Sequence, residues 1–132
     1  PAADDLEEEV ARFRAKIEAG AHFAMTQVFF DWTHWDRFLE VLGGPCPIPI
    51  LVAVWPLTSH RLALRLHNEV PGIVVPAWLL DKLEAAGPQA RVEGRAVARE
   101  ILQEARVRAA GAYIIAPFKK PKAALRVLGI EP

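Results

Sequence analysis

The amino-acid sequence predicts an α/β protein built from parallel βα units. Three short apolar segments, each rich in β-branched or aromatic residues, are separated by longer segments with helical periodicity. The apolar segments lack a strict apolar–polar alternation, which is typical of strands buried on both faces of a parallel sheet. Helices between consecutive strands form the right-handed crossovers that parallel strands require. The predicted strands are residues 21–30, 49–57 and 112–118.

The first predicted helix, residues 5–18, carries apolar side chains at spacings of three and four residues and has three glutamates in its first turn. This spacing places the apolar side chains on one face of a helix, and acidic residues are favourable near a helix N-terminus. Another helix is predicted to begin at Pro76 and to end before Gly87, because proline is tolerated in a first turn and glycine often follows a last turn. The other predicted helices are residues 33–42, 59–68, 92–109 and 122–128.

Three parallel strands are too few to close a sheet. The chain has 132 residues, whereas an eight-stranded (βα)8 barrel typically needs about 250. An open sheet of three strands also has two unpaired edges, which folded proteins usually cover. We therefore expect residues 1–132 to form a single partial domain, a part of a barrel that another segment or a partner chain completes.

Composition and charge exclude several classes of protein. Hydrophobic residues make up 52% of the chain, which excludes intrinsic disorder. Lysine plus arginine and aspartate plus glutamate both number 16, so the net charge gives no reason to expect nucleic acid or an anionic membrane as partner. No apolar segment approaches the roughly 20 residues of a membrane span, and the N-terminus lacks the features of a signal peptide. The single cysteine, Cys46, favours a reducing, cytoplasmic location.

Ligands of parallel α/β folds bind at the carboxyl ends of the strands. Gln27 is an amide within an otherwise apolar predicted strand, and a buried amide without partners costs about 1–3 kcal/mol. Either the neighbouring backbone or a ligand can satisfy it, and the pattern leaves both open. Asp31 is predicted to cap the next helix. Lys119 and Lys120, after the third strand, either hold an anion or lie in solvent. The histidine spacings do not indicate a metal site.

Three segments carry a resemblance to a known family. Residues 16–31, KIEAGAHFAMTQVFFD, resemble the K-x-x-AGA-x-x-x-x-TQ-x-FFD segment of methylenetetrahydrofolate reductases. Residues 49–59, PILVAVWPLTS, are similar to the family's PI-x-PGI-x-P-x-S segment. Residues 67–76, HNEVPGIVVP, are similar to the form found in bifunctional homocysteine methyltransferase–methylenetetrahydrofolate reductases. The resemblance places the chain in the C-terminal half of the family's TIM (βα)8 barrel, from the fifth helix to the eighth strand and helix.

The resemblance implies a flavin-dependent oxidoreductase. In the family, NADH or NADPH reduces FAD, and the flavin passes hydride to 5,10-methylenetetrahydrofolate to give 5-methyltetrahydrofolate; the cofactor supplies this chemistry. The family's acidic catalytic residues and most of its flavin site lie in the N-terminal half. The resemblance therefore implies no catalytic residue in this half and an inactive isolated chain. The alternative is a non-catalytic half-barrel that binds or assembles, completed by a separate N-terminal half or by self-association.

The resemblance also implies roles for individual residues. Gln27 matches the amide that hydrogen-bonds the folate pterin, whose edge offers both donors and acceptors. Leu66 matches an apolar residue close to the stacked pterin or nicotinamide. Lys16 matches a lysine that contacts FAD, and Arg12 and Glu9 match further positions on the FAD side of the same helix.

The sequence departs from the family pattern at positions where the family binds its folate substrate. The family usually ends its last strand with Leu-Asn-Arg, and that arginine pairs with the glutamate carboxylate of the folate. Here Phe118, Lys119 and Lys120 stand at those positions. Lys120 keeps the positive charge but loses the two-pronged geometry of a guanidinium group. Leu62 stands where the family often has a glutamine that binds substrate.

Overall fold

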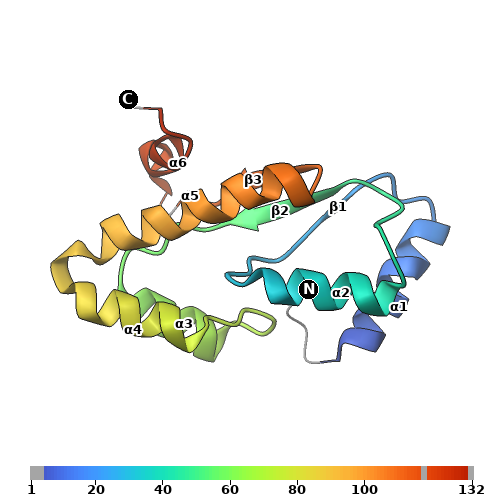
Figure 1. The fold of residues 1–132 in the computed structure, drawn as a ribbon, viewed down its shortest axis with the longest axis horizontal. Helices are drawn as coiled ribbons and strands as arrows, with labels where there is room; N and C mark the ends of the chain where they lie inside the picture. The colour runs from blue at the N-terminus through green and yellow to red at the C-terminus, as the bar shows by residue number, and fades with distance from the viewer. Residues whose placement is uncertain (1–4, 117–118, 131–132) are drawn as a thin grey trace.

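A computed structural model of the chain describes residues 5–116 and 119–130. Its centre is a parallel three-stranded sheet in the order β1-β2-β3 (Figure 1). The strands are β1 (Ala24–Met25), β2 (Ile50–Val54) and β3 (Gly111–Ile114). Met25 pairs with Leu51, and Leu51 pairs with Gly111. The predicted α/β class with parallel βα units is confirmed.

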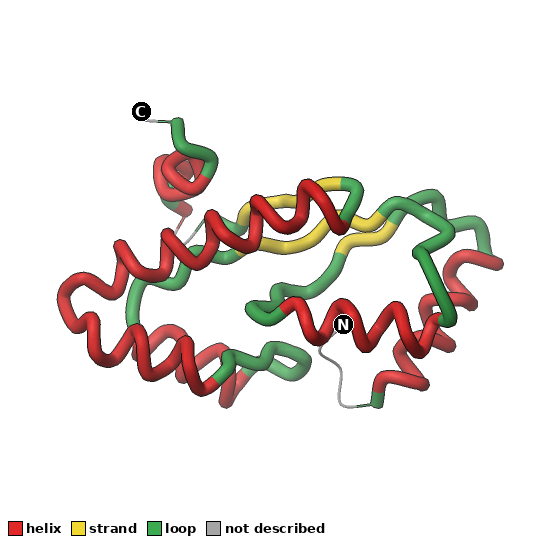
Figure 2. Tube along the Cα trace, in the orientation of Figure 1, coloured by secondary structure: helices red, strands yellow, loops and turns green. Residues whose placement is uncertain are grey.

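Helices connect and flank the strands, as Figure 2 shows in red. Each predicted helix is present, and the largest difference lies between the fourth and fifth helices. Gly87 ends one helix with a positive φ of 51°, but the chain continues through a 3₁₀ turn, so that the next helix begins at Ala90 and not at residue 92. The helices are α1 (Leu6–Glu18), α2 (Trp32–Leu42), α3 (His60–Glu69), α4 (Ala77–Ala86), η1 (Gly87–Gln89), α5 (Ala90–Arg108) and α6 (Pro121–Val127).

The first predicted strand, residues 21–30, is mostly wrong as a strand. Only Ala24 and Met25 pair with β2, although the hydrogen bond from Thr26 N to the Leu51 carbonyl continues the ladder for one more residue. The next apolar residues, 28–30, are almost completely buried, but they pack in the core without pairing. Their apolar character therefore reflects burial in the core beyond the end of the strand, and not strand pairing. The second and third strands are also shorter than predicted, and residues 117–118 of the third lie outside the described residues.

Two hydrophobic clusters hold the helices to the sheet. The first joins α1 and α2 to β2 and includes an edge-to-face contact between Phe13 and Phe38, whose ring centroids lie 5.3 Å apart. The second joins α3, α4 and α5 to the far end of β2, where Val54 and Leu57 are almost completely buried. Figure 1 shows the two groups of helices, α1 with α2 and α3 with α4, towards opposite ends of the molecule. Burial of this apolar area is the main stabilising contribution.

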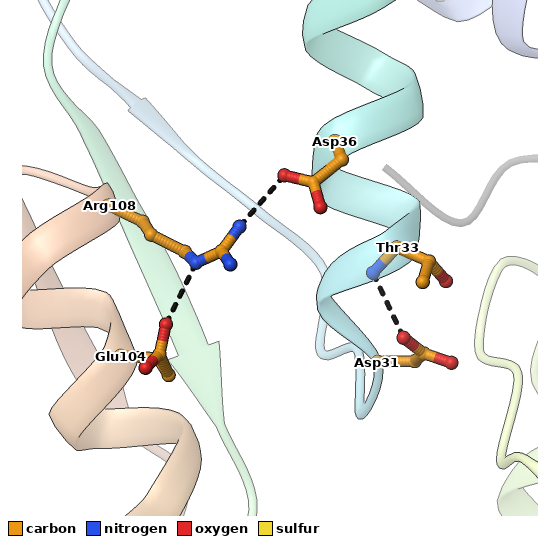
Figure 3. A network of polar contacts seen from close by, with 5 residues as sticks. All are labelled: Asp31, Thr33, Asp36, Glu104 and Arg108. Carbon is orange, nitrogen blue, oxygen red and sulfur yellow. Dashed lines mark hydrogen bonds and ion pairs between the residues drawn. The ribbon is translucent and has the colours of Figure 1, made fainter.

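A polar network also ties α5 to α2 (Figure 3). The Arg108 guanidinium donates to Glu104 on its own helix and to Asp36 on α2, with both nitrogen–oxygen distances at 2.8 Å. The guanidinium also lies 5.5 Å from the centroid of the Trp32 ring. Exposed ion pairs contribute at most about 1 kcal/mol, so this network fixes the relative position of the two helices more than it stabilises them.

Asp31 caps α2, as predicted. Its side chain accepts a hydrogen bond of 2.9 Å from the backbone N–H of Thr33 (Figure 3). That hydrogen bond is the main reason why the pKa of Asp31 lies below its usual value of 3.8. A carboxyl group whose pKa falls on folding stabilises the fold above the pKa of the unfolded chain, and this contribution is lost as the pH falls through the lowered value.

We therefore expect Asp31→Ala to lower the free energy of unfolding by about 1 kcal/mol at neutral pH. The difference from the wild type is expected to narrow below about pH 4, where the carboxyl group becomes protonated. Urea denaturation at several pH values measures both effects. Asp31→Asn is the matched control, because asparagine caps equally well without a titratable group. A constant deficit for alanine across the whole pH range would contradict the role of the charge.

Candidate functional site

Three of the residues singled out by the sequence line one pocket of about 240 Å³ between α1 and the free edge of β1. Glu9 and Lys16 reach it from α1, and Gln27 reaches it from the segment that follows β1. Pro71 and Gly72, from the loop after α3, also line it. We call it the α1–β1 pocket. It joins residues from all three segments that carry the family resemblance, although these segments lie apart in the sequence.

Gln27 differs from the sequence-based expectation, because its side chain is exposed and not buried. Its Oε1 accepts a hydrogen bond of 3.0 Å from the backbone N–H of Val28. The neighbouring backbone thus satisfies the oxygen, which is one of the two alternatives left open by the sequence. No hydrogen bond of its amide nitrogen to another described residue is present, so both of its N–H donors remain available to a ligand.

Two contacts fix the backbone that precedes Gln27. The Tyr113 hydroxyl donates to the carbonyl oxygen of Thr26 at 2.5 Å, and the Thr26 hydroxyl accepts from the Ala53 N–H at 3.2 Å. Tyr113 is the register partner of Ala53, so its ring crosses β2 to reach β1. Burial raises the pKa of Tyr113, which keeps its hydroxyl protonated and able to donate. No sequence pattern predicted this contact, since Thr26 and Tyr113 both fit ordinary strand propensity.

The other predicted site residues lie elsewhere. Arg12 is exposed on α1 and pairs with Glu8 one turn earlier. Leu66 is 6% exposed and packs in the core beneath α3. Lys120 lines a different pocket, between α5 and α6. Their assigned roles in binding FAD, pterin and the folate carboxylate stay predictions.

Gln27 and Lys120 nevertheless follow strands of the same sheet. They lie beyond the carboxyl ends of β1 and β3, with β2 between these strands. Neighbouring strands are separated by about 4.8 Å, and a strand rises about 3.3 Å per residue. β1 ends level with Leu51 and β3 ends level with Val54, so the two strand ends are offset by three residues and lie about 14 Å apart. A single elongated ligand lying across the carboxyl edge of the sheet can contact both positions.

The described part of the chain offers little for metal binding. Among residues 5–116 and 119–130, no group of three or more histidine, cysteine, aspartate or glutamate side chains could hold a metal ion. Over the same residues, no helix has both the length and the apolar character needed to cross a membrane.

Comparison with known proteins decides the family. The family model for methylenetetrahydrofolate reductase matches residues 1–122. The chain belongs to the methylenetetrahydrofolate reductase family. The resemblance to this family is thereby confirmed, whereas the likeness of residues 67–76 to the bifunctional form stays a prediction.

Individual relatives agree with this family assignment and show how much of the family the chain spans. Methylenetetrahydrofolate reductase 2 of Schizosaccharomyces pombe is 32% identical over 78 residues, which are 55% of this chain and 12% of the relative. The 5,10-methylenetetrahydrofolate reductase of Escherichia coli is 23% identical over 107 residues, which are 78% of this chain and 36% of the relative. The chain thus matches about a third or less of these curated reductases.

A solved structure shares the fold. An uncharacterized protein from Clostridium thermocellum that binds two copies of 5-methyl-5,6,7,8-tetrahydrofolic acid matches with a TM-score of 0.64 and 18% sequence identity. The match covers 91% of this chain and 46% of that protein. The three parallel strands and their helices therefore form a recurring arrangement that makes up about half of a larger fold, in agreement with a partial TIM barrel.

Proposed function

We propose that residues 1–132 are the C-terminal half of a methylenetetrahydrofolate reductase barrel, and that they supply a folate-binding wall to a flavin-dependent oxidoreductase. The observation that carries this proposal is the α1–β1 pocket, in which Gln27, Lys16 and Glu9 meet. The match with a protein that binds a methylated folate supports it. In this assignment the N–H donors of Gln27 bind the pterin, and Lys120 pairs with the carboxylate at the other end of the folate.

The residues of α1 fit part of an FAD site. Lys16 offers an exposed cation to a pyrophosphate, and the half-buried carboxylate of Glu9 can accept hydrogen bonds from ribose hydroxyls. Glu9 and Lys16 are seven residues apart, which is about two helical turns, so they share a face of α1. FAD, when bound, supplies hydride transfer between NADH or NADPH and the folate. The chain itself orients the substrate through Gln27 and keeps that residue in place through Thr26 and Tyr113.

A second assignment rests on the open sheet. Phe23, which precedes β1, is 57% exposed, and Met25, within β1, is 54% exposed. Among the described residues, β1 pairs on one side only. Such an edge is a template for another strand. In a non-catalytic half-barrel this edge serves assembly with a partner half or a second copy of the chain. In the reductase it is covered by the N-terminal half of the barrel. The cytoplasmic location expected from the single cysteine stays a prediction.

Gln27→Ala separates the two assignments. In the intact protein that contains this chain, we expect the affinity for 5-methyltetrahydrofolate to fall about three- to tenfold, because one or two hydrogen bonds to the pterin are lost. Isothermal titration calorimetry measures the change. Gln103→Ala, an exposed glutamine on α5 outside both pockets, is the matched control. Equal affinities for the wild type and Gln27→Ala would favour the non-catalytic half-barrel.

A further inference from the structure

The pocket between α5 and α6 has a charge that the overall composition hides. It has a volume of about 370 Å³ and lies beyond the carboxyl ends of β2 and β3. All six ionisable residues that line it, among those the structure describes, are basic. They are Arg91, Arg95, Lys119, Lys120, Lys122 and Arg126. The chain has 16 basic and 16 acidic residues, so this α5–α6 pocket is a local concentration of positive charge.

Within residues 5–116 and 119–130, no acidic side chain forms an ion pair with these cations. The ion pairs found among the described residues involve none of the six. Like charges around one pocket repel each other, and a bound anion relieves this repulsion. Apolar residues also line the pocket, among them the buried Leu57 together with Pro121 and Ala123. A pocket that combines an apolar lining with charged groups is typical of a small-molecule site.

The packing of α6 on α5 keeps the basic side chains of both helices around the same pocket. The side chain of Arg99 on α5 donates to the backbone carbonyl of Arg126 on α6, with a distance of 3.0 Å from its Nε. Arg99 does not itself line the pocket and therefore acts as a clamp between the helices. Arg91 and Arg95 are one turn apart on α5, and Lys122 and Arg126 are one turn apart on α6.

The number of cations indicates the kind of anion. A single carboxylate is satisfied by one or two basic groups, and the proposed function assigns only Lys120 to a folate carboxylate. The remaining cations extend over two helices and the segment before α6. Guanidinium groups match the planar geometry of both carboxylate and phosphate oxygens. The zero net charge of the chain argues against a nucleic-acid polymer as the source of the charge.

We propose that the α5–α6 pocket binds a multiply charged small anion, either a row of carboxylates or a chain of phosphates. Such a group extends past Lys120 to Arg91 and Arg95 on one side and to Lys122 and Arg126 on the other. A ligand with this group gains affinity from the pocket in proportion to its number of negative charges. This site does not depend on Gln27 or on the α1–β1 pocket.

The test is calorimetric titration of the intact protein with triglutamate, with inorganic tripolyphosphate and with acetate. We expect at least one of the two multiply charged probes to bind more tightly than acetate and to weaken as sodium chloride is added. Tighter binding of triglutamate identifies a carboxylate chain, and tighter binding of tripolyphosphate identifies a phosphate group. If neither binds more tightly than acetate, the proposal is wrong.

Variants locate the site. The double variant Arg91→Glu, Arg95→Glu is expected to lose at least about tenfold in affinity for the bound probe, because charge-assisted hydrogen bonds are removed and repulsion is added. Lys122→Glu, on the exposed start of α6, provides a second variant in case the double variant does not fold. Arg61→Glu, an exposed arginine on α3 outside the pocket, is the matched control. Unchanged affinity in both pocket variants would overturn the proposal.

This experiment is independent of the folate assignment. Gln27→Ala is expected to bind the anionic probes as the wild type does, even where it has lost affinity for 5-methyltetrahydrofolate. A wild-type protein that binds the anionic probes but not 5-methyltetrahydrofolate would count against the proposed function alone. Retained folate binding with no anion binding would count against the α5–α6 pocket alone.

Discussion

Replacing Gly94 with alanine is expected to destabilise the fold by at least about 2 kcal/mol, although alanine is the better helix former. Gly94 is buried in α5, where the helix backbone touches the segment that follows β2. A Cβ atom added at this position would lie 1.7 Å from the carbonyl oxygen of Leu57 and 2.7 Å from its carbonyl carbon. Both atoms belong to the backbone, so no change of rotamer can relieve the clash. Overpacking of this kind typically costs about 1–3 kcal/mol, and occasionally more.

The sign of the effect distinguishes packing from helix propensity. In an exposed helix, a change from glycine to alanine stabilises by about 1 kcal/mol, so the two causes predict opposite results for Gly94→Ala. Urea denaturation followed by circular dichroism measures the free energy of unfolding. Ala96→Gly, an exposed position two residues later in α5, calibrates the propensity and is expected to lose about 1 kcal/mol. An increase in stability for Gly94→Ala would show that α5 can move away from Leu57.

The same contact links stability to the proposed anion site. Leu57 lines the α5–α6 pocket, and Arg91 and Arg95 lie close to Gly94 on α5. A shift of α5 away from Leu57 would move both arginines relative to Lys120. We therefore expect any Gly94→Ala protein that still folds to bind multiply charged anions more weakly than the wild type.

Helix positions were predictable from the sequence because amphipathic periodicity is a local signal. The segment from residues 5–18 and the cap at Asp31 depend on side chains a few residues apart, and the structure agrees with both. Strand length was less predictable. Residues 28–30 are apolar because the core surrounds them, and a strand buried on both faces has the same composition. Only strand pairing distinguishes the two cases, and among the described residues the pairing of β1 with β2 covers Ala24 and Met25 and not residues 28–30.

The candidate site depended on contacts that no local pattern contains. Gln27 was singled out as a buried amide, whereas the chain turns out of the sheet after Thr26 and exposes it. The contact between Tyr113 and Thr26 joins residues 87 positions apart. The helical spacing places Glu9 and Lys16 on one face of α1, but it does not say which strand they approach. The family resemblance assigned Lys16 to FAD and Gln27 to the folate pterin, and the structure adds that both side chains line one pocket.

The isolated chain is expected to show no flavin-dependent reductase turnover, with a rate below about a thousandth of that of the intact protein. Catalysis of hydride transfer depends on holding the reacting groups at about 3–3.5 Å and on excluding water. In the isolated chain the α1–β1 pocket is open along the free edge of β1, where Met25 is 54% exposed. Gln27 and Lys16 then contact ligands from one side only, which permits binding without a fixed geometry.

The measurement is oxidation of NADH or NADPH in the presence of FAD and 5,10-methylenetetrahydrofolate, with the isolated chain and the intact protein compared at equal concentration. Free FAD without protein sets the background. If the missing segment is what closes the pocket, adding it as a separate chain should restore turnover, because a new strand on the edge of β1 covers Phe23 and Met25. Turnover by residues 1–132 alone would show that half a barrel positions the flavin. Inactivity of the intact protein as well would favour the non-catalytic half-barrel, in which the free edge of β1 serves assembly.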